Sequence, residues 1–179
     1  HRSTKIFCYP IAAPAEEGTS PAEIARVYKA LGDLMHRALF LDRDGVINVD
    51  HGYVGHPDDF DEVPGVAELM RAAKQAGYLI IIVTNQSGIA RGHFNLDEYD
   101  ALEKHMRESF SARGIYLTGV YYCPHHPQGV VPEFAIPCSC RKPAPGMILR
   151  AAREHDIDLS RSILIGDKPS DIEAAAAAG

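Results

Sequence analysis

The stretch Ala38-Leu39-Phe40-Leu41-Asp42-Arg43-Asp44-Gly45 decides the fold. Its first four residues form an uninterrupted apolar run, which is typical of a parallel strand covered on both faces. The run ends at Asp42, and the following Gly45-Val46-Ile47 does not open a good helix, so helix capping alone does not explain that carboxylate. We therefore expect a buried strand over residues 38–41 that brings Asp42 and Asp44 to its carboxyl end.

Helical and strand-like segments alternate along the rest of the chain. Residues 78–83 are rich in β-branched side chains and predict a second strand, and further strands are expected over 120–122 and 162–165. Helices are expected over 66–76, 96–113, 145–155 and 170–178; Asn95 suits an N-cap, and Gly77 and Gly114 suit helix ends. This alternation predicts an α/β fold, a three-layer Rossmann-like parallel sheet with helices on both faces and an active site at the strands' carboxyl ends.

Length and composition exclude several other classes of protein. The 179 residues suit one ordinary domain, and 46% hydrophobic with 23% charged residues argue against disorder. The net charge of −6, without a basic cluster, argues against nucleic acid or an anionic membrane as the main partner. No apolar run is long enough to cross a bilayer. With four cysteines and no export signal, we expect the protein to be cytoplasmic. We also expect it to be a monomer.

Residues 1–37 differ from the sequence that follows. Ser20-Pro21-Ala22-Glu23 has the pattern of a helix start, with an N-cap serine, a first-turn proline and a capping-box glutamate. Apolar residues then recur at helical spacing as far as Met35. We expect an N-terminal extension over 1–37 with one amphipathic helix of unassigned role, and a catalytic domain over 38–179.

Polar residues follow three of the expected strands at the point where each strand ends. Asp42 follows the first strand, Thr84 the second and Asp167 the fourth, so all three should meet at one edge of the sheet. Asp44 lies two residues after Asp42 and should point the same way. These carboxylates would repel one another without a hard cation, so the side chains of Asp42, Asp44 and Asp167 are expected around one Mg²⁺-sized gap. Lys142 and Thr84 could complete the contacts to a phosphoryl group.

These residues resemble, in chain order, the four motifs of the haloacid-dehalogenase superfamily of phosphatases. The resemblance covers about residues 38–179 and implies that Asp42 is the nucleophile and Asp44 the general acid and base. It also implies that Thr84 and Lys142 hold the phosphoryl group, and that Mg²⁺ binds the carboxylates of Asp42 and Asp167 and the backbone carbonyl of Asp44. Two roles remain open for Asp171: capping its helix, or orienting a metal-bound water or Lys168.

Longer strings narrow the resemblance to the histidinol-phosphatase-like subfamily. They are Val49-Asp50-His51-Gly52-Tyr53, the run from Thr84 to Gly92, and Tyr122-Cys123-Pro124-His125-His126-Pro127. These strings are similar to those of subfamily members that remove one phosphate from a heptose bisphosphate. The alternatives are a histidinol-phosphate phosphatase, a non-catalytic zinc-stapled binding module or an inactive fragment. The resemblance implies that the substrate is lined by Asp50, His51, Gly52, Tyr53, Asn85, Gln86, Ser87, Arg141 and Lys168.

The loop after the third expected strand carries a candidate zinc site. Cys123, His125, Cys138 and Cys140 flank a segment rich in proline and glycine with few core-forming side chains, and a metal could hold its shape. Four protein ligands would leave no open position, so the zinc should be structural.

Family members also continue into a further strand beyond the position of Gly179, so the fourth strand is expected at an open edge.

Overall fold

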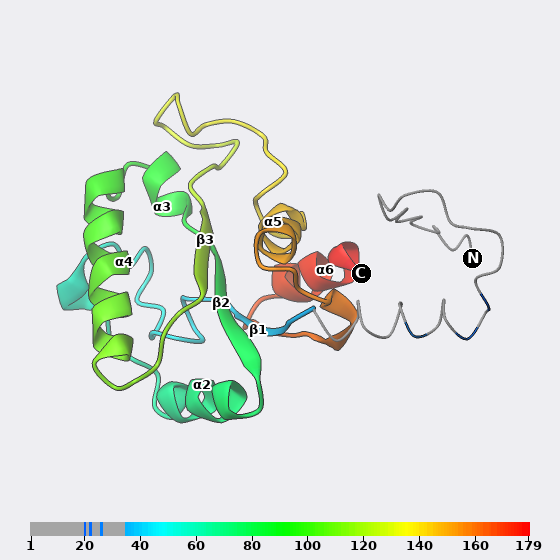
Figure 1. The fold of residues 1–179 in the computed structure, drawn as a ribbon. Helices are drawn as coiled ribbons and strands as arrows, with labels where there is room; N and C mark the ends of the chain where they lie inside the picture. Colours follow the sequence, from blue (N-terminus) through cyan, green and yellow to red (C-terminus); the bar gives the residue numbers. More distant parts are fainter. Residues whose placement is uncertain (1–19, 21, 23–25, 27–34) are drawn as a thin grey trace. The chain divides into compact units, whose positions relative to one another are not determined.

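The computed structural model describes residues 20, 22, 26 and 35–179, and its centre is a four-stranded parallel sheet (Figure 1). The strand order is β3–β2–β1–β4, with β1 at Arg37–Leu41, β2 at Tyr78–Asn85, β3 at Gly119–Cys123 and β4 at Ile163–Ile165. Leu39 pairs with Ile80 of β2 on one side and with Ile163 of β4 on the other. The four expected strands are confirmed.

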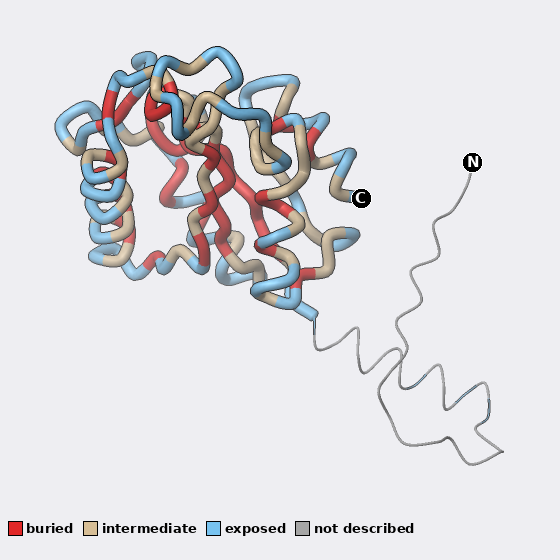
Figure 2. The backbone as a smooth tube through the Cα atoms, turned by 90° about the horizontal axis from the view of Figure 1, so that it is seen from above, coloured by how far each residue is buried: buried red, intermediate tan, exposed pale blue. Residues whose placement is uncertain are grey.

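Alternate residues of β1 pack against opposite helical layers. Phe40 belongs to a core with Met147 and Ile148 of helix α5, Gly146–Glu154, and with helix α6, Pro169–Ala178. Leu41 belongs to a second core, built with helix α2, Val66–Gln75, and helix α4, Leu96–Ser111. Figure 2 shows the buried strands running through the centre of the molecule. The three-layer architecture is therefore as expected, because a parallel sheet needs cover on both faces.

Local signals set the helix ends. The side chain of Asn95 accepts a hydrogen bond from the backbone N–H of Glu98 at 3.0 Å, and the Glu98 carboxylate accepts one from the backbone N–H of Asn95 at 2.7 Å. This capping box starts α4 at the expected residue. Gly77 follows α2 with a φ of +83°, a left-handed conformation that glycine adopts without steric cost.

Several details differ from the expectations. Strand β2 continues to Asn85, so Thr84 lies within the strand, and a short helix α3, Ser87–Ala90, was not predicted. Two 3₁₀ turns, η1 at Pro57–Asp59 and η2 at Leu159–Arg161, also lie in segments expected as loops. Most of the expected N-terminal helix, and Cys8, lie outside the described residues. Met35–Gly179 forms one compact unit.

Strand β4 is three residues long and stands at one edge of the sheet. Its first residue, Ile163, is 49% exposed. A short edge strand offers few unpaired backbone groups to another chain, which limits edge-to-edge pairing. Within the described part of the chain, no helix is long and apolar enough to cross a membrane.

Candidate active site

The site begins with a buried ion cluster under the carboxyl ends of β1 and β2. The Lys142 Nζ atom lies 3.0 Å from Asp42 Oδ1 and 2.5 Å from Asp171 Oδ1, and it donates to the Val83 carbonyl at 2.8 Å. All three charged side chains are buried. Burial raises the pKa of the Asp42 carboxyl above its ordinary value, although the Lys142 ammonium opposes that shift. One cation facing two anions and a carbonyl limits the desolvation cost of charges held out of water.

Three carboxylates gather beside this lysine. Asp42, Asp167 and Asp171 each offer an oxygen, and these oxygens lie within 4.8 Å of one another. The two partners of Asp42 differ in exposure, because Asp167 is exposed and Asp171 is fully buried. Gly45 permits the approach: a Cβ atom there would lie 2.3 Å from Asp167 Oδ2. Clustered carboxylate oxygens, one of them open to solvent, fit a hard divalent cation such as Mg²⁺.

The prediction that the side chains of Asp42, Asp44 and Asp167 surround one gap was wrong for Asp44. Asp171 joins Asp42 and Asp167 in the cluster, and the Asp44 side chain does not. Asp171 also caps α6, because its Oδ2 accepts a hydrogen bond from the Lys168 backbone N–H at 3.0 Å. The sequence left its role open between capping and orientation; the structure adds an ion pair with Lys142, which only the folding of α6 onto the sheet could bring about.

The Asp44 carboxylate is instead held by three neighbouring side chains. Arg43 binds both of its oxygens, with Nη2 2.8 Å from Oδ1 and 3.0 Å from Oδ2. Asn48 donates to Oδ1 at 3.0 Å, and Gln86 donates to Oδ2 at 2.9 Å. Gln86 also donates to the hydroxyl of Thr84 at 2.8 Å. The Asp44 carboxylate thus lies toward the loop after β1 and the residue that follows β2, and it is not part of the carboxylate cluster.

A polar cavity of about 250 Å³ opens beside Asp44. Its lining contains seven of the nine residues expected to contact substrate, together with Asp44 and Gly88: Asp50, Gly52, Tyr53, Asn85, Gln86, Ser87 and Lys168. The other two residues are engaged elsewhere. The His51 ring nitrogen Nε2 lies 2.7 Å from Asp61 Oδ2, and Arg141 donates to the His125 carbonyl at 3.4 Å.

Opposite charges meet across the cavity wall. Lys168 Nζ lies 3.1 Å from Asp50 Oδ2 and joins the segment before α6 to the loop after β1. Burial alone would raise the pKa of Asp50, but hydrogen bonds from Lys168 and from the Gly52 amide hold it below its usual value. Lys168 is about half exposed, so its ammonium remains accessible to an anionic ligand from the cavity side.

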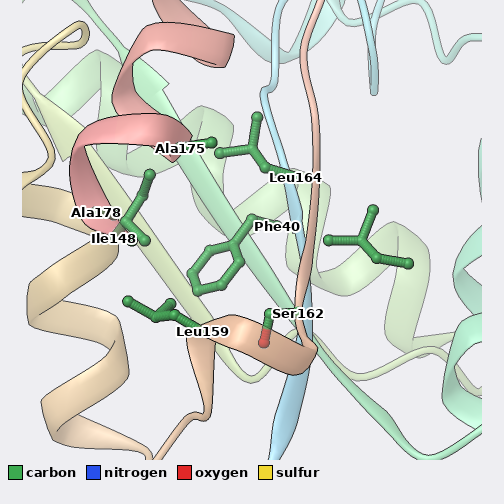
Figure 3. A pocket seen from close by; sticks show the side chains of 9 residues that line it. Phe40, Ile148, Leu159, Ser162, Leu164, Ala175 and Ala178 are labelled. Carbon is green, nitrogen blue, oxygen red and sulfur yellow. The ribbon is translucent and has the colours of Figure 1, made fainter. Parts of the chain in front are cut away.

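A second cavity, of about 50 Å³, lies between α5, α6 and the sheet (Figure 3). Its lining is apolar except for Ser162, whose hydroxyl accepts from the Ala38 backbone N–H at 2.9 Å and donates to the Asp158 carbonyl at 2.7 Å. Because that hydroxyl is already satisfied by backbone groups, this cavity offers no polar group for chemistry.

The four expected zinc ligands do come together. One nitrogen or sulfur atom from each of Cys123, His125, Cys138 and Cys140 lies within 4.8 Å of the others. The Cys140 sulfur lies 3.0 Å from the Cys123 sulfur and 3.3 Å from both the Cys138 sulfur and the His125 Nδ1. Three sulfurs and one imidazole nitrogen turned toward one point are the donor set of a tetrahedral structural zinc site. His126 points elsewhere, with its Nε2 3.1 Å from Arg91 Nη2.

Known proteins resemble the chain in both sequence and structure. Residues 139–179 match the HAD-hydrolase-like family model. The chain is 52% identical over 141 residues to the D-glycero-β-D-manno-heptose-1,7-bisphosphate 7-phosphatase of Escherichia coli K12, covering 79% of this chain and 74% of that one. The protein of the same name from Vibrio cholerae is 49% identical over 142 residues, covering 79% and 76%.

A solved structure agrees with this relationship. The D,D-heptose 1,7-bisphosphate phosphatase of B. bronchiseptica, complexed with magnesium and phosphate, superposes with a TM-score of 0.71. It is 36% identical, and the match covers 80% of this chain and 76% of that one. The fold that the two chains share is the one expected from the sequence. The chain belongs to the HAD-like hydrolases, in the family of the heptose-1,7-bisphosphate 7-phosphatases.

Proposed function

We propose that this chain is a magnesium-dependent phosphatase that removes the C7 phosphate of D-glycero-D-manno-heptose 1,7-bisphosphate. The product would supply ADP-heptose for lipopolysaccharide synthesis in the cytoplasm. The observation that carries the chemistry is the position of the buried Lys142 ammonium, which contacts Asp42 where β1 ends. The names of relatives about 50% identical support the choice of substrate.

In this mechanism Asp42 attacks phosphorus in line and forms an aspartyl-phosphate. The ester P–O bond breaks, and the leaving C7 oxygen takes a proton from Asp44. Asp44 then removes a proton from the water that attacks the phosphorus of the intermediate, which releases inorganic phosphate and restores Asp42. Lys142 and Thr84 hold the phosphoryl oxygens and offset their charge.

The carboxylates of Asp42 and Asp167, with the backbone carbonyl of Asp44, would hold the magnesium. When bound, Mg²⁺ offsets the repulsion between the phosphate dianion and the Asp42 carboxylate. Asp171 would support this site indirectly, because its Oδ1 forms an ion pair with the Lys142 ammonium at 2.5 Å. The remainder of the sugar would occupy the cavity beside Asp44, where Lys168 offers a cation to the second phosphate.

The zinc site would have a structural role in the same enzyme. Cys123 ends β3, whereas the other ligands lie in the loop before Lys142. A zinc ion bound by these four residues would therefore fix the segment that carries Lys142 to the end of the sheet. His51 and Arg141 would reach the substrate only after leaving their present partners, so we expect smaller contributions from them.

The test compares phosphate release from heptose 1,7-bisphosphate with release from histidinol phosphate. We expect a strong preference for the heptose substrate and a requirement for Mg²⁺. The Asp42→Asn variant serves as control, because it keeps the size of the side chain and removes the nucleophile. Preference for histidinol phosphate would overturn the substrate assignment. Failure of the wild-type chain to hydrolyse either ester would favour a non-catalytic module.

A further inference from the structure

Arg43 lies between the two catalytic aspartates in the sequence and is 1% exposed. Its backbone N–H donates to Asp42 Oδ1 at 2.7 Å. Its guanidinium binds Asp44 Oδ1 through Nε at 3.1 Å and through Nη2 at 2.8 Å. One residue therefore touches both carboxylates of the proposed reaction, although no motif assigns it a role.

The same guanidinium also reaches the wall of the cavity. Arg43 Nη2 donates to the Val54 carbonyl at 2.6 Å, and Tyr53, the residue before Val54, lines the cavity. The Tyr99 ring, which is fully buried, lies 5.8 Å from the guanidinium carbon and restricts its movement. A planar guanidinium can serve two acceptors in fixed directions, which the point charge of a lysine cannot do.

Phe94 also packs closely against this wall segment. A Cβ atom on Gly55 would lie 2.4 Å from the Phe94 ring, and one on Gly88 of α3 would lie 2.2 Å from it. The Phe94 ring thus packs closely against both glycines. With Arg43 bound to the Val54 carbonyl and Phe94 packed against Gly55, the wall has a fixed position relative to Asp44.

The two oxygens of Asp44 are held unequally. Oδ1 accepts from Arg43 Nε, from Arg43 Nη2 and from Asn48. Oδ2 accepts from Arg43 Nη2 and from the Gln86 amide. An amide can turn over and offer its oxygen as an acceptor, whereas a guanidinium can only donate. Each oxygen therefore faces one amide that can turn over, Asn48 for Oδ1 and Gln86 for Oδ2, and a guanidinium that cannot, so the fixed hold on the carboxylate comes from Arg43.

We propose that Arg43 is a positioning residue that holds both oxygens of the Asp44 carboxylate and ties it to the cavity wall at Val54, so that Asp44 stands in place to exchange the proton with the leaving oxygen. This inference rests on the proposed function. During phosphoryl transfer the bond from Asp42 to phosphorus forms, the ester P–O bond breaks, and the electron pair left on the ester oxygen takes the proton from Asp44. Misplacing the Asp44 carboxyl should slow this step only when the leaving oxygen needs the proton.

The experiment compares two phosphate monoesters of similar size in the full chain with Mg²⁺. Benzyl phosphate releases a basic alkoxide that needs a proton, whereas p-nitrophenyl phosphate releases a stable phenolate that does not. For Arg43→Gln we expect kcat/KM to fall about 100-fold with benzyl phosphate and less than about fivefold with p-nitrophenyl phosphate. We use kcat/KM because it reports steps only as far as the first irreversible one, before water attacks.

Arg43→Lys keeps a buried cation and carries the test if Arg43→Gln does not fold. Its kcat/KM should likewise fall more with benzyl phosphate than with p-nitrophenyl phosphate, since one ammonium cannot hold both the Asp44 carboxylate and the Val54 carbonyl. Asp44→Asn should show this difference too, and adding Arg43→Gln to Asp44→Asn should cause little further loss. Met106→Ala, a core truncation on α4, is the control for destabilisation alone and should leave the ratio of the two esters unchanged.

Equal losses with both esters in the Arg43 variants would overturn the inference and leave Arg43 with a structural role. A wild-type chain that hydrolyses neither ester, and does not hydrolyse heptose bisphosphate, would instead refute the proposed function. The two failures are therefore distinguishable.

Discussion

The Lys142 ammonium lies 2.5 Å from Asp171 Oδ1, and both side chains are buried. This ion pair joins the segment before α5 to the first turn of α6. It determines where the cation of the active site stands, because a buried lysine without an anionic partner would carry a large desolvation cost.

Removing the charge of Asp171 should therefore cost stability. Asp171→Asn keeps an oxygen to cap α6 and removes one of the two anions beside Lys142. We expect the free energy of unfolding to fall by about 3 kcal/mol, as for other broken buried pairs. Urea denaturation followed by circular dichroism measures it. Glu108→Gln, which breaks an exposed pair with Lys104, should cost less than about 1 kcal/mol. Equal losses in the two variants would contradict this account.

Adding a methyl group at Gly45 should weaken magnesium binding. The new Cβ atom would collide with Asp167 Oδ2 and push that carboxylate away from Asp42. We expect the affinity for Mg²⁺ to fall about tenfold, within the range seen when a residue that supports a metal ligand is changed. Calorimetric titration with Mg²⁺ measures it.

Gly114→Ala is the matched control for Gly45→Ala. Both glycines have positive φ, but a Cβ atom on Gly114 would meet nothing within 4 Å. Its backbone strain should lower stability without changing the affinity for Mg²⁺. If both variants bind Mg²⁺ like the wild type, Gly45 does not shape the metal site.

The purified protein should contain about one zinc ion per chain. Cys138→Ser should abolish the bound zinc and lower the melting temperature, because the loop then lacks its cross-link. Elemental analysis and differential scanning fluorimetry measure the two effects. Cys8→Ser changes the one cysteine outside the cluster and should keep both values. Full zinc content in Cys138→Ser would argue against this ligand set.

The raised pKa of Tyr121 predicts a loss of folding stability at alkaline pH. Burial, together with the hydrogen bond from its hydroxyl to Glu154 at 2.7 Å, raises the pKa of Tyr121 to about 12. The unfolded chain loses this proton near pH 10, so between pH 10 and 12 the folded state binds more protons and stability falls as the pH rises.

The gap in unfolding free energy between wild type and Tyr121→Phe should therefore shrink from pH 9 toward pH 12. Chemical denaturation at each pH measures this gap. Tyr116→Phe, at a position that is 64% exposed, controls for general alkaline effects. A gap that stays constant up to pH 12 would show that the hydroxyl keeps its proton equally in both states.

Local signals in the sequence account for the architecture of the sheet. Residues 38–41 form a strand as predicted, because a continuous apolar run is typical of a parallel strand covered on both faces. Asn95 and Gly77 lie at the helix ends where the sequence suggested them, since capping depends only on nearby backbone. Helix α3 was missed because its four residues are too short to show a hydrophobic period.

Sequence by itself determined which residues reach the edge of the sheet, because the carboxyl ends of parallel strands lie at one edge and each apolar run shows where its strand stops. Only the tertiary structure decided how their side chains pair. Spacing put Asp44 beside Asp42, but the guanidinium of Arg43 and the amide of Gln86 turn its carboxylate toward the cavity. The packing of α6 brings Asp171 to Lys142 in its place. Long-range contacts between charged groups follow from packing and desolvation, which no local pattern encodes.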